Sequence, residues 1–151
     1  MESSARKRCF EVAKGLRKGD ILLWRNYVFP DGSKKSKYAI ILSNCIEDKI
    51  YIFALPTSQI GFYKNPKNNI DTVWIKENRV KEFPALTVVD LKHHTYGRAS
   101  LFGEKIYNNT LEKIGCLPED LIKEIDEAVK KAKTLSPEIK NLIIFGKRLE
   151  S

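Results

Sequence analysis

The chain has 151 residues, which suits one domain of roughly 100 to 200 residues and suffices to bury a core without disulfides or a structural metal. Its 27 Lys and Arg against 19 Asp and Glu give a net charge of +8, which favours a polyanionic partner, although a solvated lysine-rich surface fits that balance equally well. The longest apolar runs fall far short of the roughly 18 residues that a membrane-spanning helix needs.

The N-terminal segment and the cysteines indicate the cellular compartment. The N-terminal segment is basic and lacks the apolar stretch of a secretory signal, and the three cysteines are widely spaced with no CxxC pair, which suits reduced thiols. These features favour a cytoplasmic protein without membrane association.

Positive charge is concentrated toward the N-terminus. Residues 1–37 hold ten basic and four acidic side chains, whereas residues 111–129 hold six acidic and two basic ones. Residues 1–16 are expected to be a basic extension, in which 3–15 form either a short helix anchored by Phe10 and Val12 or a disordered tail.

Short segments rich in β-branched and aromatic residues then follow as far as about Phe102. Turn residues separate them, most clearly at 30–33 and 64–69. This pattern predicts five strands in a mainly β, small curled sheet or barrel, at 21–24, 38–43, 49–55, 71–76 and 85–91.

From Asn109 onward the pattern is helical. Pro118 with Glu119 and Asp120 suits the first turn of a helix whose apolar positions recur up to Val129. Ser136 is a second N-cap candidate. We therefore expect a single domain over 17–135 that ends in a helix, and a short helical extension over 136–151.

The motif search excludes several chemistries. The chain has no phosphate-cradling glycine pattern, no HExxH and no EF-hand loop. His93 and His94 are adjacent, and adjacent side chains of a strand point to opposite faces, so the pair does not form a shared metal site. We expect neither a metal nor a cofactor.

The order of the remaining elements is more informative. Gly19-Asp20-Ile21 opens a strand, a basic loop over 31–37 leads into a second strand, and a third strand ends in Thr57-Ser58. This succession resembles the MazF/PemK-like toxins, the ribonuclease halves of bacterial toxin–antitoxin pairs. Residues 115–121 also look like the closing turn and helix of that family, and the resemblance covers roughly residues 17–132.

The resemblance implies an SH3-like barrel of about five strands followed by C-terminal helices. It also implies a homodimer that an antitoxin protein neutralises and that cleaves single-stranded RNA without a metal. Cleavage of this kind uses the 2′-hydroxyl as the nucleophile and needs a base, an acid and donors for the charge on the phosphorane.

Carried over by position, the resemblance places Thr57 and Ser58 in the RNA-cleaving site, although the same hydroxyls would also close a turn. The Arg-Pro of the family falls on Lys37-Tyr38. Lysine keeps the positive charge but cannot form the bidentate hydrogen bonds that a guanidinium group makes with phosphate. Lys34 and Lys35 would supplement it.

A second group lies on the strand at 85–91 and just beyond it. Some family members carry an Arg-x-Asp pair where this chain has Asp90 and Lys92 in the reverse order. Alternation puts Asp90, Lys92 and His94 on one face. We expect Asp90 to act as a base or to orient one, and His94 rather than His93 to titrate; the alternative is a surface ion pair beside a polar turn.

RNA contacts are expected from both aromatic and basic side chains. Tyr27, Phe29, Phe62, Tyr63 and Tyr96 lie in or beside predicted loops. Their rings, those of Phe62 and Tyr63 above all, would stack on splayed bases, unless they fill the core instead. The basic candidates are Arg25, Lys34, Lys35 and Arg98. The departures from the family leave an alternative function, a catalytically silent barrel that binds nucleic acid or a partner peptide, and a weaker one, a structural protein whose charge only maintains solubility.

Overall fold

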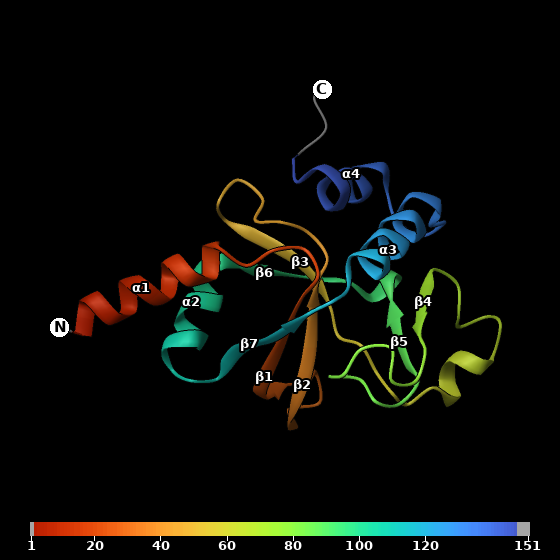
Figure 1. Cartoon of the computed structure of the whole chain (residues 1–151), viewed down its shortest axis with the longest axis horizontal. Helices are drawn as coiled ribbons and strands as arrows, with labels where there is room; N and C mark the ends of the chain where they lie inside the picture. Colours follow the sequence, from red (N-terminus) through yellow and green to blue (C-terminus); the bar gives the residue numbers. More distant parts are fainter. Residues whose placement is uncertain (1, 148–151) are drawn as a thin grey trace.

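A five-stranded antiparallel sheet forms the centre of the molecule, with a two-stranded sheet beside it (Figure 1). The computed structural model describes residues 2–147. The large sheet has the strand order β6-β3-β2-β1-β7, and the small sheet pairs β4 with β5. The strands are β1 (Asp20–Val28), β2 (Lys34–Ile41), β3 (Ile50–Ala54), β4 (Thr72–Ile75), β5 (Thr87–Asp90), β6 (Thr95–Arg98) and β7 (Leu111–Cys116).

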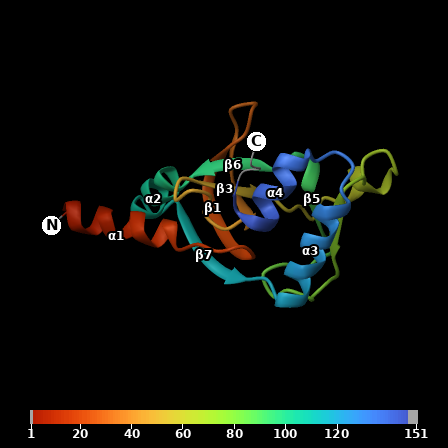
Figure 2. The same cartoon turned by 90° about the horizontal axis from the view of Figure 1, so that it is seen from above.

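The helices form two separate groups. The first group is α1 (Glu2–Lys14) with α2 (Ala99–Tyr107), and the second is α3 (Glu119–Lys131) with α4 (Pro137–Phe145) (Figures 1 and 2). Short 3-10 turns lie at η1 (Gly61–Lys64) and η2 (Leu91–His93). None of the helices in residues 2–147 combines the length and the apolar character needed to cross a bilayer.

Two apolar clusters cover the two faces of the large sheet. Ile21 and Ile40 belong to one cluster, which α3 and α4 complete, whereas their neighbours Leu22 and Ile41 belong to the other. This division follows from the alternation of side chains along a strand. Leu16, which follows α1, packs into the second cluster, so the N-terminal segment contributes to the core.

The expected α+β class is confirmed, and the five expected strands overlap β1 to β5. Within residues 2–147 the edge strands β6 and β7 do not pair, so the sheet is open and not a closed barrel. Of the two alternatives for residues 3–15, the structure has the helix, in which Phe10 packs against Gly103 of α2 whereas the other expected anchor, Val12, is exposed. Lys34 to Lys37 were expected in a loop but extend β2, because they continue the hairpin with β1.

The region from about 95 to 116 differs most from expectation. The sequence predicted neither β6 nor α2, and the prediction of helix from Asn109 is wrong up to Cys116, where β7 forms. Strand β7 pairs with β1 and buries Leu111 in the second apolar cluster. Pairing with an open sheet edge outweighs the weak helical pattern of this short segment.

A bulge interrupts the pairing of β1 with β2. Trp24 lies opposite Lys37 and Tyr27 lies opposite Lys35, so β1 carries one residue more than β2 between these pairs. Asn26 takes the left-handed conformation there, with φ 57°. The bulge brings Trp24 and Tyr27 to the same face, where their rings meet edge to face at 5.2 Å.

Candidate functional site

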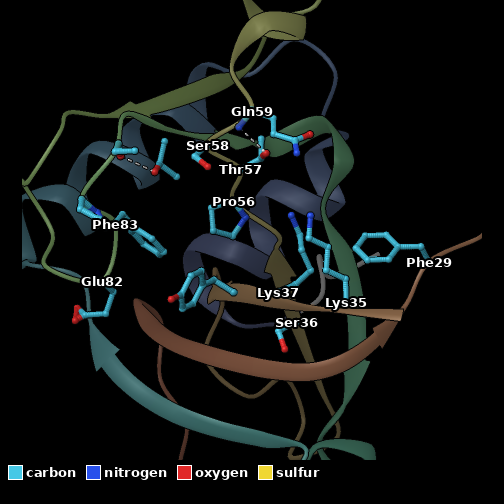
Figure 3. Close-up of a pocket in the computed structure, with 14 residues that line it drawn as sticks. Phe29, Lys35, Ser36, Lys37, Pro56, Thr57, Ser58, Gln59, Glu82 and Phe83 are labelled. Atoms are coloured by element: carbon cyan, nitrogen blue, oxygen red, sulfur yellow. Dashed lines mark hydrogen bonds between the residues drawn. The ribbon is translucent and has the colours of Figure 1, made fainter. Parts of the chain in front are cut away.

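A pocket of about 520 Å³ opens where strands β2 and β3 part. Their ladder runs only as far as the pair Ile40 and Ala54. Beyond Ala54 the chain turns to the small sheet, where Thr57 and Val88 exchange two backbone hydrogen bonds of 3.0 and 2.9 Å. The lining residues are Phe29, Lys35 to Tyr38, Pro56 to Gln59, Glu82 to Ala85 and Thr87 (Figure 3).

Two lysines form the positively charged side of this pocket. Lys35 and Lys37 are two positions apart on β2, so their side chains lie on one face, and Figure 3 shows them side by side. Among residues 2–147 no carboxylate forms a salt bridge with either ammonium. Burial lowers the pKa of Lys37, and the charge of Lys35 lowers it further. An unneutralised pair of cations in a pocket is suited to bind an anion.

Thr57 and Ser58 line the same pocket and add hydroxyl groups to it. Thr57 Oγ1 accepts a hydrogen bond of 3.1 Å from the backbone N–H of Gln59, so this hydroxyl also closes a turn. Ser58 is exposed. Thr57 and Ser58 therefore both form the turn and line the pocket. The Thr57 hydroxyl accepts a hydrogen bond from Gln59 and can still donate its own proton to a ligand.

Aromatic side chains complete the pocket, and of these only Phe29 was among the aromatic residues expected to stack on bases. Phe29 lies next to the lysines, and the rings of Tyr38 and Phe83 meet edge to face at 5.4 Å (Figure 3). Phe83 is followed by Pro84 in a segment between expected strands. An aromatic residue followed by proline in a predicted loop is the sequence signal that would have indicated the aromatic side of this pocket.

Phe62 and Tyr63, which were expected to stack on RNA bases, lie in η1 and do not line the pocket. Phe62 is exposed. Tyr63 contacts Asp90 instead. Burial raises the pKa of Tyr63 to about 12, and the charge and hydrogen bond of Asp90 add to that rise.

Asp90 forms a second polar cluster, separate from the pocket lining. Its carboxylate lies 2.7 Å from Nδ1 of His93 and 3.1 Å from Nζ of Lys92, and the Lys92 ammonium also donates to the Asn68 carbonyl at 3.0 Å. Lys92 thus joins Asp90 as expected, but His94 does not, because β5 ends at Asp90 and the η2 turn begins. His93 contacts Asp90, whereas His94 Nδ1 lies 2.8 Å from the Leu91 carbonyl.

The other expected RNA-binding residues lie away from the pocket. Arg25 forms an ion pair with Glu112 across β1 and β7. Lys34 is exposed at the start of β2, and Arg98 is exposed on the edge strand β6, opposite Ile50. Of the expected basic residues, Lys35 and Lys37 are the two that the structure brings to the pocket.

Within residues 2–147, no three His, Cys, Asp or Glu side chains are grouped as metal ligands would be. The chain matches no protein-family model, and no curated protein matches it. The chemistry of the site therefore has to be argued from the pocket itself. The pocket offers two cations, two hydroxyls and aromatic walls, which together suit a phosphate that carries a flat ring.

Proposed function

We propose that the chain is an endoribonuclease toxin of a toxin–antitoxin pair, which cleaves single-stranded RNA in this pocket without a metal. One observation carries the proposal. Lys35 and Lys37, which have no acidic partner among the described residues, share a pocket with the hydroxyls of Thr57 and Ser58, although β2 and the end of β3 are separate in the chain.

The proposed reaction is an internal transfer of the phosphodiester. The neutral amine of Lys37 takes the proton of the 2′-hydroxyl, and the 2′-oxygen forms a bond with phosphorus. The bond from phosphorus to the 5′-oxygen breaks, and that oxygen takes a proton from the ammonium of Lys35. The Thr57 hydroxyl donates to the charged phosphorane oxygens. The products are a 2′,3′-cyclic phosphate and a 5′-hydroxyl.

The lowered pKa of Lys37 supports its assignment as the base. Burial and the adjacent Lys35 charge both disfavour the ammonium, so a larger fraction of Lys37 is neutral than for an ordinary lysine. When RNA binds, the negative phosphate lies beside the positive ammonium of Lys35 and balances its charge.

The same proposal extends to the fold and the partners. The Thr57 and Val88 bridge joins the two sheets, which supports treating them together as an opened form of an SH3-like barrel. We propose a cytoplasmic homodimer that an antitoxin protein neutralises. Sedimentation equilibrium of the purified chain tests the dimer, and a monomer at micromolar concentration contradicts it.

The decisive experiment incubates the purified chain with a pool of single-stranded RNA in EDTA. We expect fragments that end in a 2′,3′-cyclic phosphate, and none from the same oligonucleotides with 2′-deoxyribose at every position. The Lys37→Met variant should lose cleavage, and Lys34→Met, on the same strand but outside the pocket, should retain it. RNA that stays intact across varied sequences contradicts the proposal.

A second candidate is an RNA-binding module that does not cleave. The separation of the Asp90 cluster from the pocket favours it, because the contact between the Asp90 carboxylate and the His93 imidazole lies outside the pocket lining. This candidate predicts salt-dependent binding of RNA that remains intact in the same incubation.

A further inference from the structure

The pocket has a negatively charged group as well as its two lysines. Glu82 lines it, and Figure 3 shows this side chain apart from Lys35 and Lys37, across the pocket. Its Oε2 atom is buried and receives no hydrogen bond from residues 2–147. A buried acceptor without a partner is unfavourable, so this carboxylate has hydrogen-bonding capacity that a ligand could use.

The Glu82 carboxylate does not neutralise the two lysine ammonium groups of the pocket. Among the described residues, Glu82 forms no salt bridge with Lys35 or Lys37, and the pocket lining also includes the apolar surfaces of Tyr38, Pro56 and Phe83. A complementary ligand therefore has an anion at one end, hydrogen-bond donors at the other and a flat apolar body between. A nucleotide has this arrangement, and 520 Å³ lies within the roughly 300 to 1,000 Å³ of small-molecule sites.

The Glu82 carboxylate lies against Gly115 of β7, where an added Cβ would be only 2.9 Å from the Glu82 carboxyl carbon. Within residues 2–147 its Oε2 atom has no hydrogen-bond partner, so a rotation toward the pocket breaks no hydrogen bond at that atom.

We propose that Glu82 recognises guanine in single-stranded RNA, with the base against the exposed part of the Tyr38 ring and a phosphate at Lys35 and Lys37. Guanine presents N1–H and the 2-amino group side by side, which match the two oxygens of one carboxylate. Adenine and cytosine place a ring-nitrogen lone pair beside their amino group, and uracil places carbonyls on both sides of N3–H. These edges present lone pairs to the carboxylate and are disfavoured.

This inference rests on RNA binding at the proposed site but not on cleavage. The test therefore uses fluorescent oligonucleotides with 2′-O-methyl ribose, which lack the nucleophile and stay intact. One guanosine stands in a uridine background, and adenosine, cytidine or inosine replaces it in matched strands. Inosine keeps N1–H and loses the 2-amino group, so it tests that contact without a change in the protein.

We expect the guanosine strand to bind about 5- to 100-fold more tightly than the adenosine strand, with inosine between them. Glu82→Gln should bring the two affinities within about threefold, while Glu77→Gln, a matched change at an exposed position outside the pocket, should keep the preference. Thermal unfolding verifies that both variants are folded.

Equal binding of all four strands overturns the inference while leaving RNA binding intact. A guanosine preference that survives Glu82→Gln also overturns it. Failure of every strand to bind at low salt overturns both this inference and the proposed function, so the two failures are distinguishable.

Discussion

The carboxylate of Asp90 lies 2.7 Å from Nδ1 of His93, and the two side chains differ sharply in exposure, at 6% for Asp90 and 65% for His93. The buried partner orients the ring, and the opposite face of the imidazole remains in solvent. Lys92 contacts the same carboxylate and is itself 21% exposed. This cluster joins the end of β5 to η1 through Tyr63.

Loss of the Asp90 carboxylate should destabilise the protein. Asp90→Ala leaves the partly buried Lys92 ammonium without its counter-ion and removes the acceptor for the Lys92 backbone N–H. We expect a loss of about 2 to 4 kcal/mol in the free energy of unfolding, measured with urea. Glu77→Ala, an exposed change, should cost less than about 0.5 kcal/mol. A similar small cost for Asp90→Ala would show that the cluster contributes little.

Tyr63 should make stability fall at high pH. Its pKa is about 12 in the folded protein and near 10 in the unfolded chain, so the unfolded state loses the proton first. The stability that Tyr63 contributes is complete below about pH 10 and is lost as the pH rises toward 12. Urea unfolding of Tyr63→Phe should show a shallower decline than the wild type over this interval. Parallel curves would refute the contribution of Tyr63.

Lys37 should cost stability while it serves binding. The burial that lowers its pKa disfavours the charged form in the folded state, and Lys37→Met removes that penalty. We expect a gain of up to about 1 kcal/mol in stability together with a drop of about tenfold or more in RNA affinity. Lys34→Met is the control, since Lys34 is exposed and outside the pocket. If both variants weaken binding equally, diffuse charge and not the pocket accounts for affinity.

Thr57→Val should separate chemistry from folding. Valine keeps the shape and removes the hydroxyl that we assign to the phosphorane, so the cleavage rate should fall by about 100-fold. The Gln59 N–H loses its acceptor, and the expected cost is about 1 kcal/mol of stability. Thr95→Val on β6 provides a comparison outside the pocket. Full cleavage by Thr57→Val would remove Thr57 from the proposed mechanism.

Gly103 is expected to control the docking of α1 on α2. A Cβ at Gly103 would lie 2.1 Å from Cδ1 of Phe10, so Gly103→Ala forces the two helices apart. Limited proteolysis should then cut within 2–14 faster than in the wild type, and the thermal midpoint should fall. At Gly61 an added Cβ meets open space, and Gly61→Ala should leave the proteolysis of α1 unchanged.

Local patterns were sufficient to predict the strands whose two faces are both buried. Ile21 with Leu22, and Ile40 with Ile41, are apolar neighbours because each pair divides between two cores. Strand β7 was missed because its exposed positions weaken any pattern, and only its pairing with β1 defines it. The structure places Lys37 and Thr57 in one pocket, which is the proximity that the order of elements suggested.

The rest of the site depends on where regular structure ends. Alternation predicted that His94 would share a face with Asp90, but the η2 turn begins one residue after Asp90 and presents His93 instead. Phe83 and Glu82 come to the pocket from a segment between strands, whose path is set by tertiary contacts such as that of Phe83 with Tyr38. No periodicity in the sequence reports such contacts.

The bulge at Asn26 lies in the β1 and β2 hairpin that carries the lysines of the pocket, and Phe29, three residues beyond it, lines the pocket. Deletion of Asn26 would leave Trp24 and Tyr27 two positions apart in a regular strand, where they would still share a face opposite Lys37 and Lys35. The deletion would remove only the local twist that a bulge adds. The length of this hairpin can therefore vary by one residue during evolution while the lysine pair keeps its partners on β1.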